Sequence, residues 1–156
     1  MFHKPEKLPN LMVAPNGARP MKKDHPAVPI TIFETAETAK ACFDAGADGI
    51  HFHMRDQKGQ HILDSGLCKE ALSELQKKVP KMHLQVTTEA VGRYSPDAMR
   101  KLAYDVVPPG ISIGIREMIP SRVPVAFFPL RAPLIYFGAL SAVLTNPVPI
   151  NNSGII

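Results

Sequence analysis

AGADGIHFHMRD, residues 45 to 56, contains the run of side chains that decides the fold. Small residues lead into a segment in which His51 and His53 alternate with apolar side chains. In a β-strand the side chains at positions i and i+2 point to the same face, so the two histidines share one face. We therefore predict a strand over about residues 49 to 55, with its apolar face packed under helices.

The sequence on both sides of this strand alternates between apolar runs and capped helical patterns. Helices are predicted to begin at Thr31, at Asp64 or Ser65, and at Ser95, because each precedes apolar residues at helical spacing. Further strands are predicted at residues 11–14, 82–89 and 110–117.

Strands that alternate with helices predict parallel pairing through right-handed crossovers, so the fold class is α/β. Parallel βα units of this kind begin both a small open sheet and a (β/α)8 TIM barrel. Four units make half of such a barrel, which typically takes about 250 residues. The sequence thus predicts either a small sheet or a barrel truncated to about half.

Residues 123–156 differ in composition from residues 1–122. They contain one charged residue, Arg131, and five prolines. The apolar run at 134–144 is shorter than the roughly 20 residues needed to cross a bilayer, so we do not expect a membrane anchor. We expect the tail to pack irregularly or to form one short apolar helix at about 134–144. We interpret 1–122 as half of a barrel domain and 123–156 as an atypical tail, either from a change of reading frame or normally buried by further strands.

Charge and cysteine content narrow the function. The 156 residues are 45% hydrophobic and carry a formal net charge of +4, with no basic run longer than a Lys pair. This disfavours a nucleic-acid partner and favours a small anionic ligand. Cys42 and Cys68 are expected to be reduced core thiols, and the N-terminus has no apolar signal region, so a cytoplasmic location is expected.

The His-x-His pair can bind a metal. Two neutral imidazoles on one strand face can bind zinc, although a catalytic zinc site usually has three protein ligands. The alternative is a pair of buried or solvent-bridged histidines without a metal. Polar groups on an otherwise apolar strand need partners, and a metal would satisfy both rings together.

Four stretches resemble the N-terminal half of the β-keto acid cleavage enzymes in order and spacing. They are APNGARPMKKDHPAVPIT, AGADGIHFHMRDQKGQ, LQVTTEAVGRYSPDAMR and SIGIREM, and the similarity covers about residues 11 to 121. The resemblance implies a zinc-dependent (β/α)8 barrel that condenses a β-keto acid with acetyl-CoA, releasing acetoacetate and a new CoA thioester.

The same resemblance implies roles for individual residues. His51 and His53 match the two zinc-ligand histidines of the family. The substrate-binding candidates are Thr87 and Thr88, at the end of the third strand, and Ser112 and Arg116, in the fourth. The family completes its zinc site with a glutamate from a late strand, so this chain is expected to bind metal weakly and to lack turnover alone.

Other polar residues have weaker support, and two other functions stay open. The loop at 17–23 could hold anionic groups of the substrate or of CoA, or its charges could simply be solvated. Asp56 could hold Arg55 or a ligand histidine, or it could be an ordinary turn carboxylate. Glu89, at a strand end, could belong to the site. The remaining candidates are Arg19, Lys22 and Lys23 in that loop, His25 either as a match to the family's loop or as a turn residue before Pro26, and His61 and His83 as surface or strand residues.

The first alternative function is another metal-dependent barrel, such as an amidohydrolase-type hydrolase, although that type carries its His-x-His on the first strand. The second is a non-catalytic fragment with a partial metal site. The open edges of half a barrel lead us to expect a homo-oligomer.

Overall fold

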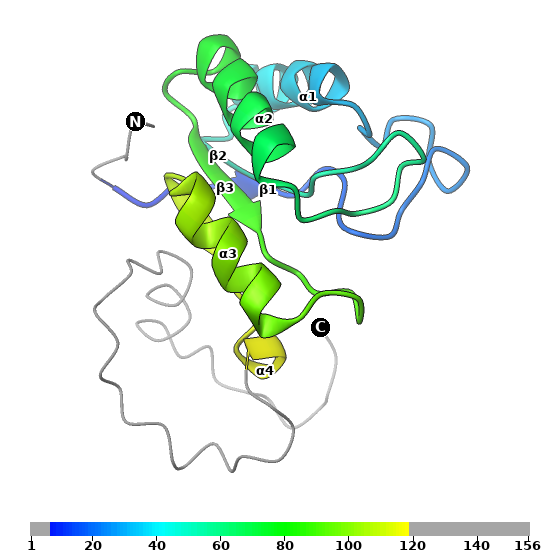
Figure 1. Ribbon diagram of the computed structural model, residues 1–156. Coiled ribbons are helices and arrows are strands. Elements are labelled where there is room, and N and C mark those ends of the chain that lie inside the picture. Colours follow the sequence, from blue (N-terminus) through cyan, green and yellow to red (C-terminus); the bar gives the residue numbers. More distant parts are fainter. Residues whose placement is uncertain (1–6, 119–156) are drawn as a thin grey trace, which may run out of the picture.

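The computed structural model describes residues 7–118, and there it confirms the alternation of strands and helices. Figure 1 shows α1 and α2 side by side, with α3 next to α2. In chain order the elements are β1 (Met12–Val13), α1 (Ile32–Asp44), β2 (Gly49–Phe52), α2 (Ser65–Lys78), β3 (His83–Thr87), α3 (Pro96–Val106), β4 (Gly110–Ser112) and α4 (Ile115–Met118). The boundary expected at residue 122 and the helix expected at 134–144 lie outside the described residues.

The four strands form one parallel sheet in the order β1-β2-β3-β4, which confirms the predicted pairing. Each strand therefore lies beside the next strand along the chain. Parallel strands have their carboxyl ends at the same edge, so the loops that follow β1, β2 and β3 meet there. The loops after β1 and β2 project to the same side of the molecule in Figure 1.

The helices begin where the sequence predicts. The Thr31 side chain accepts a hydrogen bond from the backbone N–H of Glu34, and the Glu34 side chain caps the Thr31 N–H in return. Asp64, and not Ser65, caps α2. Ser95 caps α3, which has a proline in its first turn. Local capping thus fixes each helix start after its loop.

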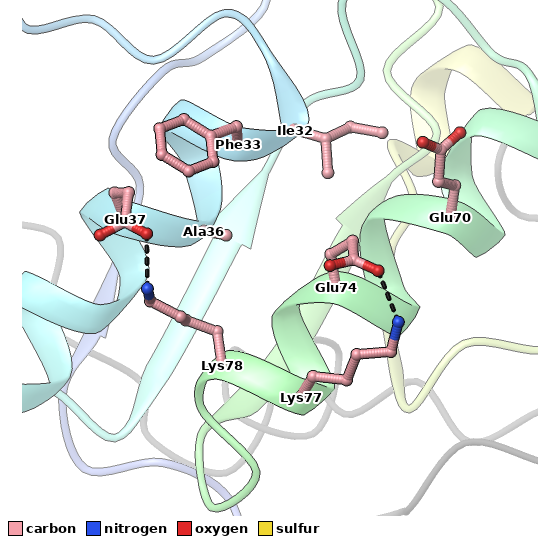
Figure 2. Close-up of a pocket in the computed structure, with 8 residues that line it drawn as sticks. All are labelled: Ile32, Phe33, Ala36, Glu37, Glu70, Glu74, Lys77 and Lys78. Carbon is pink, nitrogen blue, oxygen red and sulfur yellow. Dashed lines mark hydrogen bonds and ion pairs between the residues drawn. The ribbon is translucent and has the colours of Figure 1, made fainter.

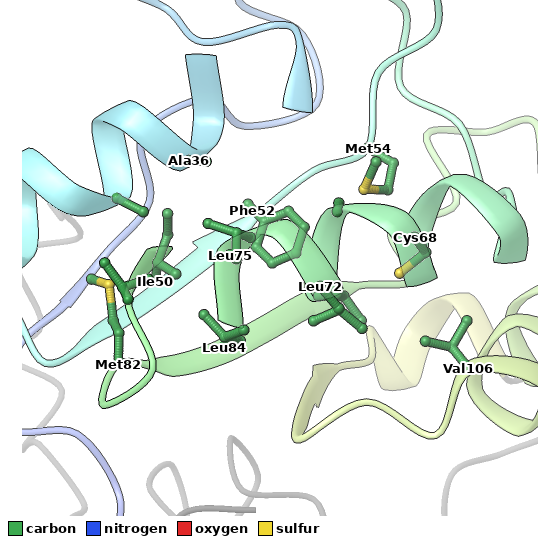
Figure 3. Packing of buried hydrophobic residues seen from close by; sticks show 14 of the residues in the cluster. Ala36, Ile50, Phe52, Met54, Cys68, Leu72, Leu75, Met82, Leu84 and Val106 are labelled. Carbon is green, nitrogen blue, oxygen red and sulfur yellow. The ribbon is translucent and has the colours of Figure 1, made fainter. Parts of the chain in front are cut away.

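The apolar face of β2 lies in the core, as predicted. Ile50, Phe52 and Met54 belong to one buried cluster with side chains from the helices (Figure 3). Cys68 is fully buried in this cluster, and burial raises the pKa of its thiol to about 12. Both cysteines are free thiols. His51 of β2, and His53 just after it, are consequently directed to the opposite face of the sheet.

A carboxylate fastens the short first strand. Asp48 lies just before β2, and its side chain accepts hydrogen bonds from the backbone N–H groups of Asn10 and Leu11, at 2.8 and 2.7 Å. These two hydrogen bonds lower the pKa of Asp48. A two-residue strand forms few ladder hydrogen bonds, so this side chain supplements its attachment to β2.

All four strands are shorter than predicted, and the second and fourth end early for identifiable reasons. β2 ends at Phe52 because the next backbone N–H, that of His53, donates to the Asn16 side chain and not to a neighbouring strand. The fourth strand ends at Ser112, and the chain turns into α4. Arg116 therefore lies in a short helix, and its placement in the fourth strand was wrong.

The outer surface between α1 and α2 carries a shallow groove with paired charges on its walls (Figure 2). Lys78 of α2 forms an ion pair with Glu37 of α1 at 2.5 Å, and Lys77 forms one with Glu74 at 2.6 Å. The exposed ring of Phe33 lies at the same groove. In the described part of the chain, no helix has the length and hydrophobicity that a membrane crossing requires.

The cap of α1 predicts a pH-dependent contribution to stability. The Glu34 carboxylate accepts hydrogen bonds from the N–H groups of Ile30 and Thr31 and pairs with Lys22. Lys22, followed by these two backbone groups, lowers the pKa of Glu34 to about 2 from 4.5. A depressed carboxyl pKa stabilises the fold above the unfolded pKa, and the contribution is lost as the pH falls from 4.5 towards 2.

We expect Glu34→Gln to lower the free energy of unfolding at pH 7 by roughly 0.5 to 1 kcal/mol, because a neutral amide caps less well and cannot pair with Lys22. Urea titrations followed by circular dichroism at pH 7 and pH 3 measure this difference, which should shrink at pH 3. Glu70→Gln, on the exposed side of α2, is the control and should have little effect. An equal loss at both pH values would contradict the role of the charge.

Candidate functional site

Polar side chains from neighbouring strands meet on the face of the sheet opposite the core. His51 of β2 is in register with Gln85 of β3, and its Nδ1 lies 2.8 Å from the Gln85 Oε1. An amide oxygen can only accept, so His51 carries its proton on Nδ1 and presents the lone pair of Nε2. Gln85 thus fixes both the orientation and the tautomer of His51.

The two imidazoles converge through the same nitrogen. The Nε2 atoms of His51 and His53 are 3.2 Å apart, and the rings meet edge to face. Two nitrogens at about 2.0 to 2.1 Å from one tetrahedral zinc ion lie roughly 3.3 Å apart. The spacing of the pair therefore fits two ligands of one cation.

The second ring nitrogen of His53, Nδ1, is buried without a hydrogen-bond partner among the described residues. If the His53 Nε2–H donates to His51, then Nδ1 is an unprotonated nitrogen that faces the Glu89 carboxylate at 3.6 Å. A cation on Nε2 would instead place the proton on Nδ1, where Glu89 could accept it.

Burial keeps His53 in the neutral form that a metal ligand requires. Desolvation, followed by the nearby charges of His51 and His61, lowers the pKa of His53 to about 3. An imidazole that is neutral near pH 7 has a lone pair available for a metal without first losing a proton.

Asn16 positions the main chain of His53, a role that sequence reasoning missed. Its Oδ1 accepts the His53 N–H at 3.1 Å, and its Nδ2 donates to the His53 carbonyl at 3.0 Å and to the Pro29 carbonyl at 3.3 Å. The side chain thus replaces a strand neighbour where β1 has ended. The Pro-Asn-Gly sequence indicated only a turn at this place.

Arg55 ties the loop after β1 to the loop after β2. Its buried guanidinium donates to the carbonyls of Asn16, Gly17 and Pro20, at 3.1, 2.7 and 2.8 Å from Nη2, and to Gly59 through Nη1. Burial lowers the pKa of this guanidinium. The charge is thus met by backbone dipoles rather than by a carboxylate.

Asp56, proposed as one partner for Arg55, forms the turn instead. Its carboxylate accepts the backbone N–H groups of Lys58 and Gln60 at 2.9 and 2.8 Å. Of the two interpretations that the sequence allowed, the turn carboxylate is confirmed. This turn holds the loop that follows β2 in one conformation.

The hydroxyl candidates lie at the ends of β3 and β4. The Oγ1 of Thr87 and the Oγ of Ser112 are 3.3 Å apart, and Thr87 also accepts the Glu89 N–H at 3.0 Å. The Thr88 hydroxyl is fully buried and donates to the Ser112 carbonyl at 3.1 Å. Thr87 is on the same face of β3 as Gln85, whereas the Thr88 hydroxyl links the end of β3 to the backbone of β4.

Arg116 does not lie with these residues in any described contact. It is exposed in α4, and among residues 7–118 no hydrogen bond or ion pair joins it to His51, His53 or Thr87. The residue that follows it, Glu117, accepts the Ala90 N–H at 3.1 Å and so fastens α4 to the loop after β3.

The remaining histidines differ in environment. His61 is buried and not on the surface, because its two ring nitrogens lie 3.1 and 3.0 Å from the carbonyls of Met54 and Glu89. Its ring centroid is 5.1 Å from that of His53. His83 is a buried strand residue at the opposite end of β3, and His25 is an exposed turn residue.

The charged side chains of the loop at 17–23 have different partners. Lys22 pairs with Glu34 at 2.7 Å, and Arg19 pairs with Glu89 at 3.1 Å. Lys23 is exposed. Of the charged residues in this loop, Arg19 is connected to the histidine pair, because its partner Glu89 also lies next to His53.

The histidine pair could supply two ligands to a metal ion, which is fewer than a complete site needs. Within residues 7–118, no group of three or more His, Cys, Asp or Glu side chains is arranged to hold a metal ion. The residues present fit a metal as a partial ligand set, with Gln85 and Glu89 placed to support the two rings.

Comparisons with known proteins find one enzyme family and several relatives. A family model described as beta-keto acid cleavage enzyme matches residues 10–145. The 3-oxoadipate:acetyl-CoA acetyltransferase of Cupriavidus necator is 36% identical over 78 residues, which are 50% of this chain and 28% of that protein.

Two proteins named 3-keto-5-aminohexanoate cleavage enzyme are also similar. That of Fusobacterium nucleatum is 33% identical over 72 residues, and that of Acetoanaerobium sticklandii is 32% identical over 72 residues. Each match covers 46% of this chain and 26% of the relative. The matched segment thus spans about a quarter of the length of these curated relatives.

Arg55→Met should destabilise the fold by about 2 to 4 kcal/mol, because several buried carbonyls lose their donor together. Urea unfolding at pH 7 measures the loss. Arg100→Met is the matched control: Arg100 forms an exposed ion pair with Asp97, and its replacement should change stability by less than about 0.5 kcal/mol. Equal effects of the two substitutions would show that Arg55 does not hold the loops.

Proposed function

The chain belongs to the β-keto acid cleavage enzyme family, and from this premise we propose that it forms part of a zinc-dependent enzyme that condenses a β-keto acid with acetyl-CoA. The products are acetoacetate and a new CoA thioester. The relatives' names support this reaction class, since one names 3-oxoadipate and acetyl-CoA and others name 3-keto-5-aminohexanoate cleavage. The single observation that carries the metal proposal is the 3.2 Å approach of the His51 and His53 Nε2 atoms.

His51 and His53 are the proposed metal ligands. Gln85 holds the His51 lone pair towards the shared point, and Asn16 holds the backbone of His53. Glu89 lies where it could accept the proton of His53 Nδ1. Each ligand thus has its own supporting residue, which is the usual arrangement around metal-binding histidines.

Thr87 and Ser112 are proposed to orient the keto acid. Their hydroxyl oxygens are close together at the carboxyl ends of β3 and β4, the edge of the sheet that also carries the histidine pair. Neighbouring hydroxyls can donate two hydrogen bonds to one carboxylate. Thr88 is proposed in a supporting role, because its hydroxyl holds the Ser112 backbone. Arg116 stays a proposed partner of the substrate carboxylate, from α4.

A zinc ion, when bound, supplies a Lewis acid that can polarise the keto oxygen of the substrate. The chain's own residues hold the ligand rings in place and exclude water from one side, since His53 and Thr88 are buried. Two imidazoles are fewer than the usual three ligands of a catalytic zinc site. We expect the third ligand from outside residues 7–118, and the TIM barrel and the homo-oligomer stay predictions.

The metal proposal is tested with cobalt(II), whose visible absorption reports ligands that zinc cannot reveal. We expect the purified chain to bind cobalt(II) weakly, and His51→Ala and His53→Ala to weaken that binding by at least about tenfold each, because one of two ligands is lost. Gln85→Leu should weaken cobalt(II) binding less, since it releases the His51 ring from its hydrogen bond but leaves both metal-binding nitrogens in place.

His25→Ala is the matched control for these variants, because it removes an exposed histidine that serves only a turn. Its cobalt(II) affinity should equal that of the unsubstituted chain. Equal affinity in all of the histidine variants, with the fold intact by circular dichroism, would contradict the ligand assignment.

The reaction is tested by turnover. We expect the 156-residue chain alone to form little or no acetoacetate from acetyl-CoA and either 3-oxoadipate or 3-keto-5-aminohexanoate, because two ligands do not hold keto acid and thioester together. A chimera that carries this chain's segment in place of the aligned segment of the Cupriavidus necator enzyme should form acetoacetate.

In the chimera, Thr87→Val should lower kcat/KM by more than about tenfold, as expected for a lost hydroxyl contact to the substrate, and Thr88→Val by less. Turnover by the chain alone, lost on chelation and restored by zinc, would show that the two histidines suffice. An inactive chimera that still folds and binds zinc would contradict the proposed reaction.

A further inference from the structure

A second pocket lies beside the histidine pair and has a strongly positive lining. It has a volume of about 390 Å³, within the usual range of about 300 to 1,000 Å³ for small-molecule sites. The residues that the argument uses are Arg19, Arg55, Lys58, His61, Val91 and Arg93. They come from the loops after β1, β2 and β3, so three separate loops build this pocket.

Part of the positive charge of this pocket is available to bind an anion. Four of its lining side chains are cationic, and no acidic side chain of residues 7–118 lines it. Arg19 already pairs with Glu89, and Arg55 is committed to backbone carbonyls. Lys58 and Arg93 form no ion pair in the described part of the chain, so they carry the unbalanced charge.

The backbone around the pocket is held in unusual conformations. Val91 has φ of +47°, although a β-branched residue is strained in the left-handed region, and the next residue, Gly92, has φ of +72°. Gly59 on the facing loop has φ of +75°. Arg93 bridges these loops, because its guanidinium donates to the Gln60 Oε1 at 3.0 Å and to the His61 carbonyl. The positive groups are therefore presented by fixed turns.

The pocket is one side chain away from the proposed metal ligands. The His61 ring lines the pocket and packs at 5.1 Å, between centroids, from the ring of His53. Arg19 reaches the same histidine through Glu89, whose Oε2 is 3.6 Å from the His53 Nδ1. A ligand anchored here by an anionic end could extend its other end to the histidine pair.

The groove between α1 and α2 offers no comparable charge. Its lysines Lys77 and Lys78 are already paired with glutamates, as Figure 2 shows, and it lies between the outer helices. Unlike this groove, the pocket lined by Lys58 and Arg93 combines positive charge that is in no ion pair among residues 7–118 with proximity to the histidines.

We propose that the pocket formed by Arg19, Lys58 and Arg93 binds the phosphate groups of CoA, so that the thiol end of the cofactor points towards His51 and His53. This inference rests on the proposed function, which requires acetyl-CoA. Acetyl-CoA carries a diphosphate and a 3′-phosphate towards one end and its thioester at the other. A cationic pocket at one side of a metal site matches that division of charge.

The test is CoA binding to the purified 156-residue chain, measured by isothermal titration calorimetry without metal or keto acid. We expect CoA and adenosine 3′,5′-bisphosphate to bind, and pantetheine, which lacks phosphate, to bind at least about tenfold more weakly. The affinity for CoA should fall as sodium chloride is raised, because the pocket is open to solvent.

Lys58→Glu and, separately, Arg93→Gln should each weaken CoA binding by about tenfold, since each removes a charge-assisted contact. Lys58→Arg should retain the affinity. The matched control is Lys81→Glu, an exposed lysine at the other end of β3, which should bind CoA as the unsubstituted chain does. Circular dichroism verifies that each variant is folded.

The possible outcomes separate this inference from the proposed function. CoA binding that is absent, equal in all variants, or matched by pantetheine would overturn the pocket assignment. Inorganic pyrophosphate that binds as tightly as CoA would show a general anion site and also overturn it. Charge-dependent CoA binding without a histidine-dependent cobalt(II) spectrum would support the pocket and refute only the metal proposal.

Discussion

The buried guanidinium of Arg55 is the interaction on which the polar side of this molecule depends. It gathers the carbonyls of the loop after β1 and of the loop after β2 around one positive charge. That contact holds Asn16 in place, and Asn16 in turn holds the backbone of His53 beyond the end of β2. The two imidazoles therefore converge because Arg55 and Asn16 hold the loops together, and not only because His51 lies in a strand.

The balance of charge around the histidines gives the site its chemical character. His53 is kept neutral by burial, so its lone pair carries no extra proton near pH 7. Glu89 is shared between Arg19 and the edge of His53, so one carboxylate connects the proposed metal ligands with the cationic pocket. A metal and an anionic substrate would then reinforce each other, because each adds charge of the sign that the other requires.

Local patterns in the sequence were sufficient to predict the fold, and only part of the site. The period-two alternation around His51 and the caps at Thr31 and Ser95 are encoded within a few residues, so the strands, helices and histidine face are confirmed. The partnership of His51 with Gln85, and the burial of His61, depend on contacts between residues far apart in the chain. Arg116 was misplaced because an apolar run does not reveal where a ladder stops and a helix begins.

The consecutive order of the four strands has a consequence for how the chain reaches this structure. Each of the four described strands pairs with the one made just before it, across a single helix, so within residues 7–118 no strand pairing waits for a distant later segment. Contacts of this kind close loops of moderate length and favour rapid, stepwise assembly. During synthesis the first two strands, with the Arg55 contacts between their loops, could form before the third strand emerges from the ribosome. Each later strand would then pair with the edge of a sheet that has already formed.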